Sequence, residues 1–129
     1  QSRMENREIY QKIYDELEKY FPAGWNKVIY YAEYGEGVYQ MEFFVSDHKG
    51  EYIKCFDIPG VTMREPLDTF KIIDGYIKKT RSNLSEKDRW TNMTVTMYST
   101  GKFEAHFDYT DLSENGYEYK KAWKKQYLV

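Results

Sequence analysis

NMTVTMYSTGKFEAHF, residues 92–107, is the stretch that decides the fold. In residues 92–97, three large apolar side chains alternate with Asn and Thr, and the last five residues again alternate Phe and Ala with Glu and His. A period of two indicates a β-strand that turns one face to a core. The intervening Ser-Thr-Gly-Lys is typical of a turn, so the stretch predicts a β-hairpin. The side chains of its second strand that we expect to face the core are Phe103, Ala105 and Phe107.

A second antiparallel unit is predicted upstream of this hairpin. Residues 28–34 and 38–45 are rich in β-branched and aromatic side chains, and they flank a Gly-Glu-Gly turn. Residues 51–56 have the same character and follow the turn at residues 47–50. We therefore expect three consecutive antiparallel strands, which can bury one face when a helix lies beside them.

Three other segments have helical spacing. In the first, apolar residues recur every four positions until Pro22 and Gly24 end the pattern. Pro66 is suited to the first turn of a second helix, and residues 113–128 predict a short terminal one. The apolar positions of these helices are Ile9, Ile13, Leu17, Phe21, Phe70, Ile73, Ile77, Leu84, Tyr119, Ala122, Trp123 and Tyr127. The order α-βββ-α-ββ-α predicts an α+β fold with an antiparallel sheet of about five strands.

The composition indicates one globular domain. A chain of 129 residues with 41% hydrophobic and 31% charged residues is long enough for one core and too apolar for the disordered class. We expect the domain to span residues 4–129, and we expect residues 1–3, which precede Met4, to be a foreign addition. The net charge of -2 gives no basic excess of the kind that binds a phosphate backbone, which argues against a direct nucleic-acid partner.

The cysteine content and the hydropathy pattern point to the cytoplasm. Cys55 is the only cysteine, so no internal disulfide can form, and no apolar stretch has the length of a signal sequence or a membrane span. We therefore expect a cytoplasmic chain that does not enter a membrane. Cys55 lies in a predicted strand without the surroundings of an activated thiol, and we expect it to be a buried structural residue.

Few residues suggest catalysis or a cofactor. The chain has two histidines, of which His48 lies in a predicted turn, and it lacks phosphate-binding, nucleophile-elbow and zinc-ligand motifs. Alternation places Glu104, His106 and Asp108 on one strand face, where they could hold a divalent metal in a small hydrolase. Their core-facing neighbours explain the same residues as a solvated strand face. We expect no enzyme activity and no cofactor, and we keep the hydrolase as an alternative.

Acidic residues are concentrated in two stretches. Residues 104–118 contain five carboxylates and no Lys or Arg, and residues 33–51 contain five carboxylates and one lysine. If the two hairpins adjoin in one sheet, they would present an acidic, tyrosine-bearing surface to a basic protein partner. A plain solvated sheet face explains the charges equally well. With 14 tyrosines in the chain, a self-associating interaction module is a further alternative.

Several segments, in order along nearly the whole chain, resemble the YezG-like immunity protein family. They are FPAGWNKV at residues 21–28, YAE at 31–33, EY at 51–52 with DIP at 57–59, WTNMT at 90–94, and STGKF at 99–103 running on to Tyr109 and Asp111. The resemblance implies an antitoxin that binds the toxic domain, typically a nuclease, of a secreted bacterial toxin. It implies no catalytic residues. We expect most of the matching residues to maintain the fold and the partner to be selected by Asp108, Tyr109, Asp111, Glu114 and Glu118.

Overall fold

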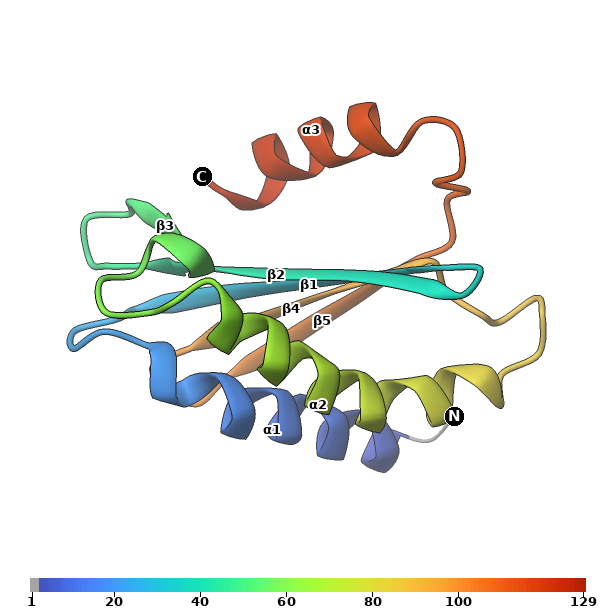
Figure 1. The fold of residues 1–129 in the computed structure, drawn as a ribbon, viewed down its shortest axis with the longest axis horizontal. Coiled ribbons are helices and arrows are strands. Elements are labelled where there is room, and N and C mark those ends of the chain that lie inside the picture. Colours follow the sequence, from blue (N-terminus) through green and yellow to red (C-terminus); the bar gives the residue numbers. More distant parts are fainter. Residues whose placement is uncertain (1–2) are drawn as a thin grey trace.

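The structure is a computed structural model that describes residues 3–129 (Figure 1). Residues 1 and 2 of the expected foreign addition lie outside the described residues. The elements are α1 (Arg3–Leu17), β1 (Lys27–Gly35), β2 (Val38–Ser46), β3 (Tyr52–Lys54), α2 (Arg64–Ser82), β4 (Asn92–Tyr98), β5 (Phe103–Asp108) and α3 (Gly116–Tyr127), with short 3-10 helices at Glu18–Tyr20 and Cys55–Asp57. The predicted α+β class and the order α-βββ-α-ββ-α are confirmed.

The five strands form one antiparallel sheet in the order β3-β2-β1-β4-β5. The two predicted hairpins adjoin because β1 pairs with β4 along Lys27–Glu33. Figure 1 shows α1 and α2 against one face of the sheet and α3 against the other. The sheet therefore lies between two helical layers, and both of its faces are covered over its central strands.

The larger core lies between the sheet and the pair α1 and α2. Alternate residues of β1, β2 and β4 point into it, because strand side chains alternate between faces. The predicted helix positions Ile13, Leu17, Phe70, Ile73 and Ile77 pack against them and are nearly inaccessible to solvent. Burial of this one face against helices fixes the register, since a slip by one residue would exchange the two faces.

Two details at the sheet edges differ from the sequence predictions. Strand β3 ends at Lys54, so Cys55 begins a 3-10 turn instead of lying in the strand, although the prediction that it is buried is confirmed. Ala105 lies opposite the core residue Val95, on the strand face that was predicted to turn to the core, but it is exposed. Strand β5 is an edge strand, and its long side chains Phe103 and Phe107 reach the core, whereas a methyl group is too short to do so.

Helix α3 covers the opposite face through aromatic side chains. Trp123 is 3% exposed and packs on Tyr31, with ring centroids 4.9 Å apart, and on Phe44. Its indole Nε1 donates a hydrogen bond of 2.9 Å to Thr94 Oγ1. The hydroxyl of Tyr119 donates one of 3.0 Å to the side chain of Asn92. Asn92 and Thr94 of β4 are therefore buried and hydrogen-bonded to a helix.

Tyrosines of the sheet bury their rings and satisfy their hydroxyls. Tyr30 is inaccessible, and its hydroxyl donates to Met41 Sδ at 3.1 Å. Tyr34 donates to Asp74 Oδ1 at 2.6 Å, and Tyr31 donates to a carboxylate oxygen of Glu33 at 2.9 Å. Burial raises the pKa of each of these three phenols above the usual value of 10.0. These side chains are part of the core, which accounts for much of the tyrosine content.

Alkaline pH is expected to unfold the chain in step with ionisation of its buried tyrosines. Below pH 10.0 the phenols are protonated in both states, so their stabilising effect is fully present. Above that pH the unfolded chain releases protons that the raised pKa values retain in the folded chain, and stability falls. Phenolate absorbance and circular dichroism, followed on one sample, should change together for the buried fraction. Complete tyrosine ionisation without loss of the dichroism signal would contradict this.

Candidate partner-binding surface

The acidic sheet face that the sequence predicts is not free. Helix α3 lies over it, and Lys120 Nζ approaches Glu42 Oε2 to 2.7 Å with both side chains mostly buried. The same ammonium group lies 3.8 Å from the centroid of the Tyr31 ring. The two hairpins do adjoin in one sheet, but part of the acidic surface that this would present is an internal contact between the sheet and its covering helix.

The end of β5 and the loop after it carry the first of the predicted partner residues. Asp108 is partly buried, and its Oδ1 accepts hydrogen bonds from Thr110 N at 2.8 Å and from Thr110 Oγ1 at 2.6 Å. Asp111 Oδ1 accepts one of 2.9 Å from Ser113 N. These bonds lower the pKa of both carboxyls, since they favour the charged form. Asp108 thus shapes the loop, while Asp111 remains exposed.

The other predicted partner residues are accessible. Tyr109 is 57% exposed, and Glu114 in the turn before α3 and Glu118 in its first turn are exposed as well. Tyr117, which the sequence prediction omitted, is 79% exposed beside them. We call Tyr109, Asp111, Glu114, Tyr117 and Glu118 the acidic loop surface. It combines charged groups with large exposed rings, which is the chemistry of many protein interfaces.

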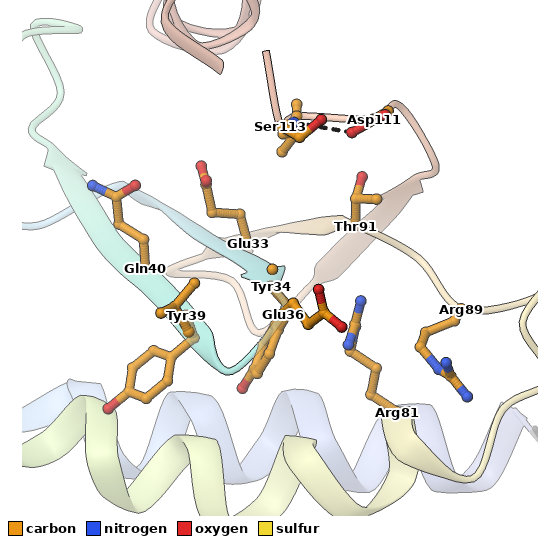
Figure 2. Close-up of a pocket in the computed structure, with 13 residues that line it drawn as sticks. Glu33, Tyr34, Glu36, Tyr39, Gln40, Arg81, Arg89, Thr91, Asp111 and Ser113 are labelled. Carbon is orange, nitrogen blue, oxygen red and sulfur yellow. Dashed lines mark hydrogen bonds between the residues drawn. The ribbon is translucent and has the colours of Figure 1, made fainter. Parts of the chain in front are cut away.

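A cleft of about 850 Å³ lies at this end of the sheet (Figure 2). Its walls come from the turn between β1 and β2, from the end of α2 and the segment after it, and from the loop after β5. Asp111 lines it together with Glu33 and Glu36. Carboxylates from both predicted acidic stretches therefore meet here, at the end of the sheet and not across its face.

Two arginines that the sequence interpretation did not select line the same cleft (Figure 2). Arg81, in the last turn of α2, donates from Nε to the Trp90 carbonyl at 2.8 Å, and its guanidinium lies 5.0 Å from the centroid of the Tyr34 ring. Arg89 donates from Nη2 to the Leu84 carbonyl at 2.8 Å. No motif marks these residues, because their proximity to the acidic loop depends on the tertiary fold.

Comparison with known sequences identifies the family of this chain. Residues 6–129 match the family described as "Immunity protein YezG-like". The chain belongs to the YezG-like immunity protein family. It is similar to "Immunity protein YezG" of Bacillus subtilis (strain 168), at 27% identity over 95% of this chain and 87% of that protein. A second such protein, from Bacillus spizizenii (strain ATCC 23059 / NRRL B-14472 / W23), is 26% identical over 90% of this chain and 78% of its own length.

The structure gives the hydrolase alternative no support in this member of the YezG-like family. Glu104 forms an ion pair of 3.0 Å with Lys102, and Asp108 is occupied by Thr110. Among residues 6–129, whose side chains the structure describes, no three His, Cys, Asp or Glu side chains are grouped so that they could hold a metal ion. The described part of the chain also has no helix with the length and hydropathy needed to span a membrane.

Proposed function

We propose that this chain is an immunity protein that binds the toxic domain of a secreted bacterial toxin and neutralises it in the cytoplasm. The observation that carries the proposal is the match to the YezG-like immunity protein family over residues 6–129. The two relatives named above carry the same designation, "Immunity protein YezG". The chain acts by occupying the toxin active site or a surface beside it, and it needs no catalytic group of its own.

The acidic loop surface favours a basic toxin domain, such as a nuclease. Enzymes that act on nucleic acid present positive charge to the phosphate backbone. Asp111, Glu114 and Glu118 are exposed and would attract such a surface, which raises the association rate. Tyr109 and Tyr117 add large apolar contact areas of the kind that dominate binding energy at interfaces.

The proposal is tested by purification of the tagged chain from its native cell, followed by an assay of any toxin domain that co-purifies. A secreted-toxin domain in comparable amount, whose toxicity on expression in a host cell is abolished by this chain, is the expected result. Adding the purified chain to the toxin domain should also inhibit its activity on DNA or RNA. A toxin domain that binds the chain yet remains fully toxic would contradict the proposal.

Neutralising the acidic loop surface should slow association with the toxin domain. We expect the triple variant Asp111→Asn, Glu114→Gln, Glu118→Gln to associate about tenfold more slowly at low salt, with a weaker dependence on ionic strength, because long-range attraction is lost. Stopped-flow or surface plasmon resonance at several salt concentrations measures both effects.

A matched control removes the same charge elsewhere. Glu8, Glu51 and Asp57 are exposed and belong to α1, the turn before β3 and the 3-10 turn after β3, so their amide variants also lose three negative charges. If the position of the charges matters, this control should associate nearly as fast as the wild type. Equal rates for the two triple variants would exclude the acidic loop surface as the toxin contact.

A further inference from the structure

Strand β5 ends the sheet with an unpaired backbone edge. It pairs with β4 alone. At its two ends, the Lys102 carbonyl accepts a hydrogen bond from Tyr98 N at 2.9 Å, and the Asp108 carbonyl accepts one from Thr91 N at 2.8 Å. Even-numbered residues therefore direct their backbone N–H and C=O groups to β4, and odd-numbered residues direct theirs outward. Among the described residues, no partner bonds to these outward groups, so they can pair with another strand.

Neither helical layer covers this edge. The side chains of Glu104 and His106 lie on the α3 side of the sheet, and both residues are exposed. Ala105 lies on the other side, opposite the core residue Val95, and it is exposed as well. The helices therefore leave open space on both sides of β5, and a second strand can reach the edge without displacing either layer.

The sequence of β5 is complementary to its own reverse. Each residue on one side of Ala105 has a suitable partner at the same distance on the other side. The pairs are Glu104 with His106, Phe103 with Phe107, and Lys102 with Asp108. Two copies of the strand that pair in antiparallel orientation about Ala105 bring the members of each pair opposite one another. Aromatic rings and opposite charges at directly opposed positions stabilise a sheet.

The backbone permits this register. The N–H and C=O groups of Ala105 point outward, so Ala105 of each copy can exchange both hydrogen bonds with Ala105 of the other. A register centred on Glu104 places two copies of Glu104 opposite each other, and a register centred on His106 places Glu104 opposite Asp108. Like charges at opposed positions destabilise a sheet. Of these three registers, only the one about Ala105 avoids that repulsion.

We propose that two copies of this chain associate through their β5 edges, in antiparallel orientation about Ala105, to form one continuous sheet across a two-fold axis. Phe103 of each copy lies beside Phe107 of the other, and Glu104 of each copy accepts a hydrogen bond from His106 of the other. Both phenyl rings are partly exposed in the single chain, so association removes apolar surface from water. This contact uses the backbone edge of β5 and is separate from the toxin contact proposed above.

Concentration dependence tests the association in the unmodified chain. Sedimentation equilibrium from micromolar to near-millimolar concentration should show monomers in equilibrium with dimers. Over the same range, hydrogen exchange of the Phe103, Ala105 and Phe107 amides should slow as the dimer fraction rises, because these N–H groups become hydrogen-bonded. A monomer at every concentration would overturn the inference, and so would a dimer in which these three amides exchange as fast as in the monomer.

Substitutions at Ala105 test the position of the contact. Ala105→Pro removes the central N–H donor, which has no partner in the single chain, so the fold should persist while the dimer dissociation constant rises at least about tenfold. Ala105→Lys, a second variant in case proline unfolds the chain, places two like charges at the axis and should weaken association as well. The matched control is Ile53→Lys, because Ile53 is exposed in the opposite edge strand β3 and also lies opposite a core valine. Equal weakening by this control would place the contact elsewhere.

An exchange of charges provides a test that a general loss of stability cannot imitate. Glu104→Lys places a lysine opposite His106, and His106→Glu places two glutamates opposite each other, so each variant alone should dimerise at least about tenfold more weakly. In an equimolar mixture of the two variants, the introduced lysine faces the introduced glutamate, and the native Glu104 faces the native His106. Mixed dimers should then form about as tightly as the wild-type dimer. A mixture that associates no better than either variant alone would contradict the proposed register.

The same measurements distinguish a different occupant of the edge. If the chain alone stays monomeric and its β5 amides slow only after a toxin domain is added, β5 receives a strand of the toxin. Self-association is then excluded, while the proposed immunity function stands. Conversely, a dimer with the expected amide protection and no neutralisation of a toxin supports this inference and contradicts the proposed function.

Discussion

Replacing Trp123 with alanine is expected to lower the free energy of unfolding by about 3–5 kcal/mol, the cost of removing a buried Trp or Phe side chain. The indole ring is 3% exposed and fills the space between α3 and the sheet, where it contacts Tyr31 and Phe44. Its removal leaves a cavity and leaves Thr94 Oγ1 without its 2.9 Å hydrogen bond. Urea denaturation followed by circular dichroism measures the change.

A Trp123→Phe variant separates packing from hydrogen bonding. It retains a ring against the same partners and loses only the donor to Thr94, so we expect a loss of about 1 kcal/mol from the missing hydrogen bond, together with a smaller packing loss. If Trp123→Ala changes the free energy of unfolding by less than 1 kcal/mol, α3 does not stabilise the sheet and undocks independently of it. Hydrogen exchange of the α3 amides would then be as fast in the wild type as in the variant.

The strands and helices could be predicted from the sequence because their signals are local. Apolar and polar residues alternate in residues 92–97, and apolar residues recur every four positions in the first helix. Both patterns follow from the backbone geometry of strands and helices, and the structure confirms both elements. The position of α3 was not predictable in this way. Asn92, Thr94 and Thr96 have the pattern of a solvent-facing strand side, yet they are buried because a lysine-rich helix covers them.

The candidate site was predictable only where its residues are neighbours in sequence. Asp111, Glu114 and Glu118 belong to one loop and the following helical turn, and the structure places them at the surface as the sequence suggested. The cleft instead combines the turn after β1 with the end of α2 and the loop after β5. Arg81 and Arg89 meet those acids through tertiary packing, and no local spacing indicates such a meeting.

Replacing Lys120 with methionine is expected to lower the free energy of unfolding by about 3–5 kcal/mol at neutral pH, as for other buried ion pairs that lose one partner. Side-chain exposure is 17% for Lys120 and 10% for Glu42. Lys120 contacts Glu42 Oε2, while Glu42 Oε1 is buried with no hydrogen-bond partner among the described residues. Burial lowers the pKa of Lys120, and the carboxylate of Glu42 opposes that shift. The variant therefore leaves a buried negative charge without its compensation.

The double variant Glu42→Gln, Lys120→Met should recover most of the lost stability, because a neutral amide and an apolar side chain of similar length replace the two charges. Denaturation of the wild type, both single variants and the double variant forms a cycle that yields the coupling free energy. The double variant could instead be as unstable as Lys120→Met. In that case Lys120 stabilises the fold mainly through its contact with the Tyr31 ring, whose centroid lies 3.8 Å from the ammonium group, and not through its ion pair with Glu42.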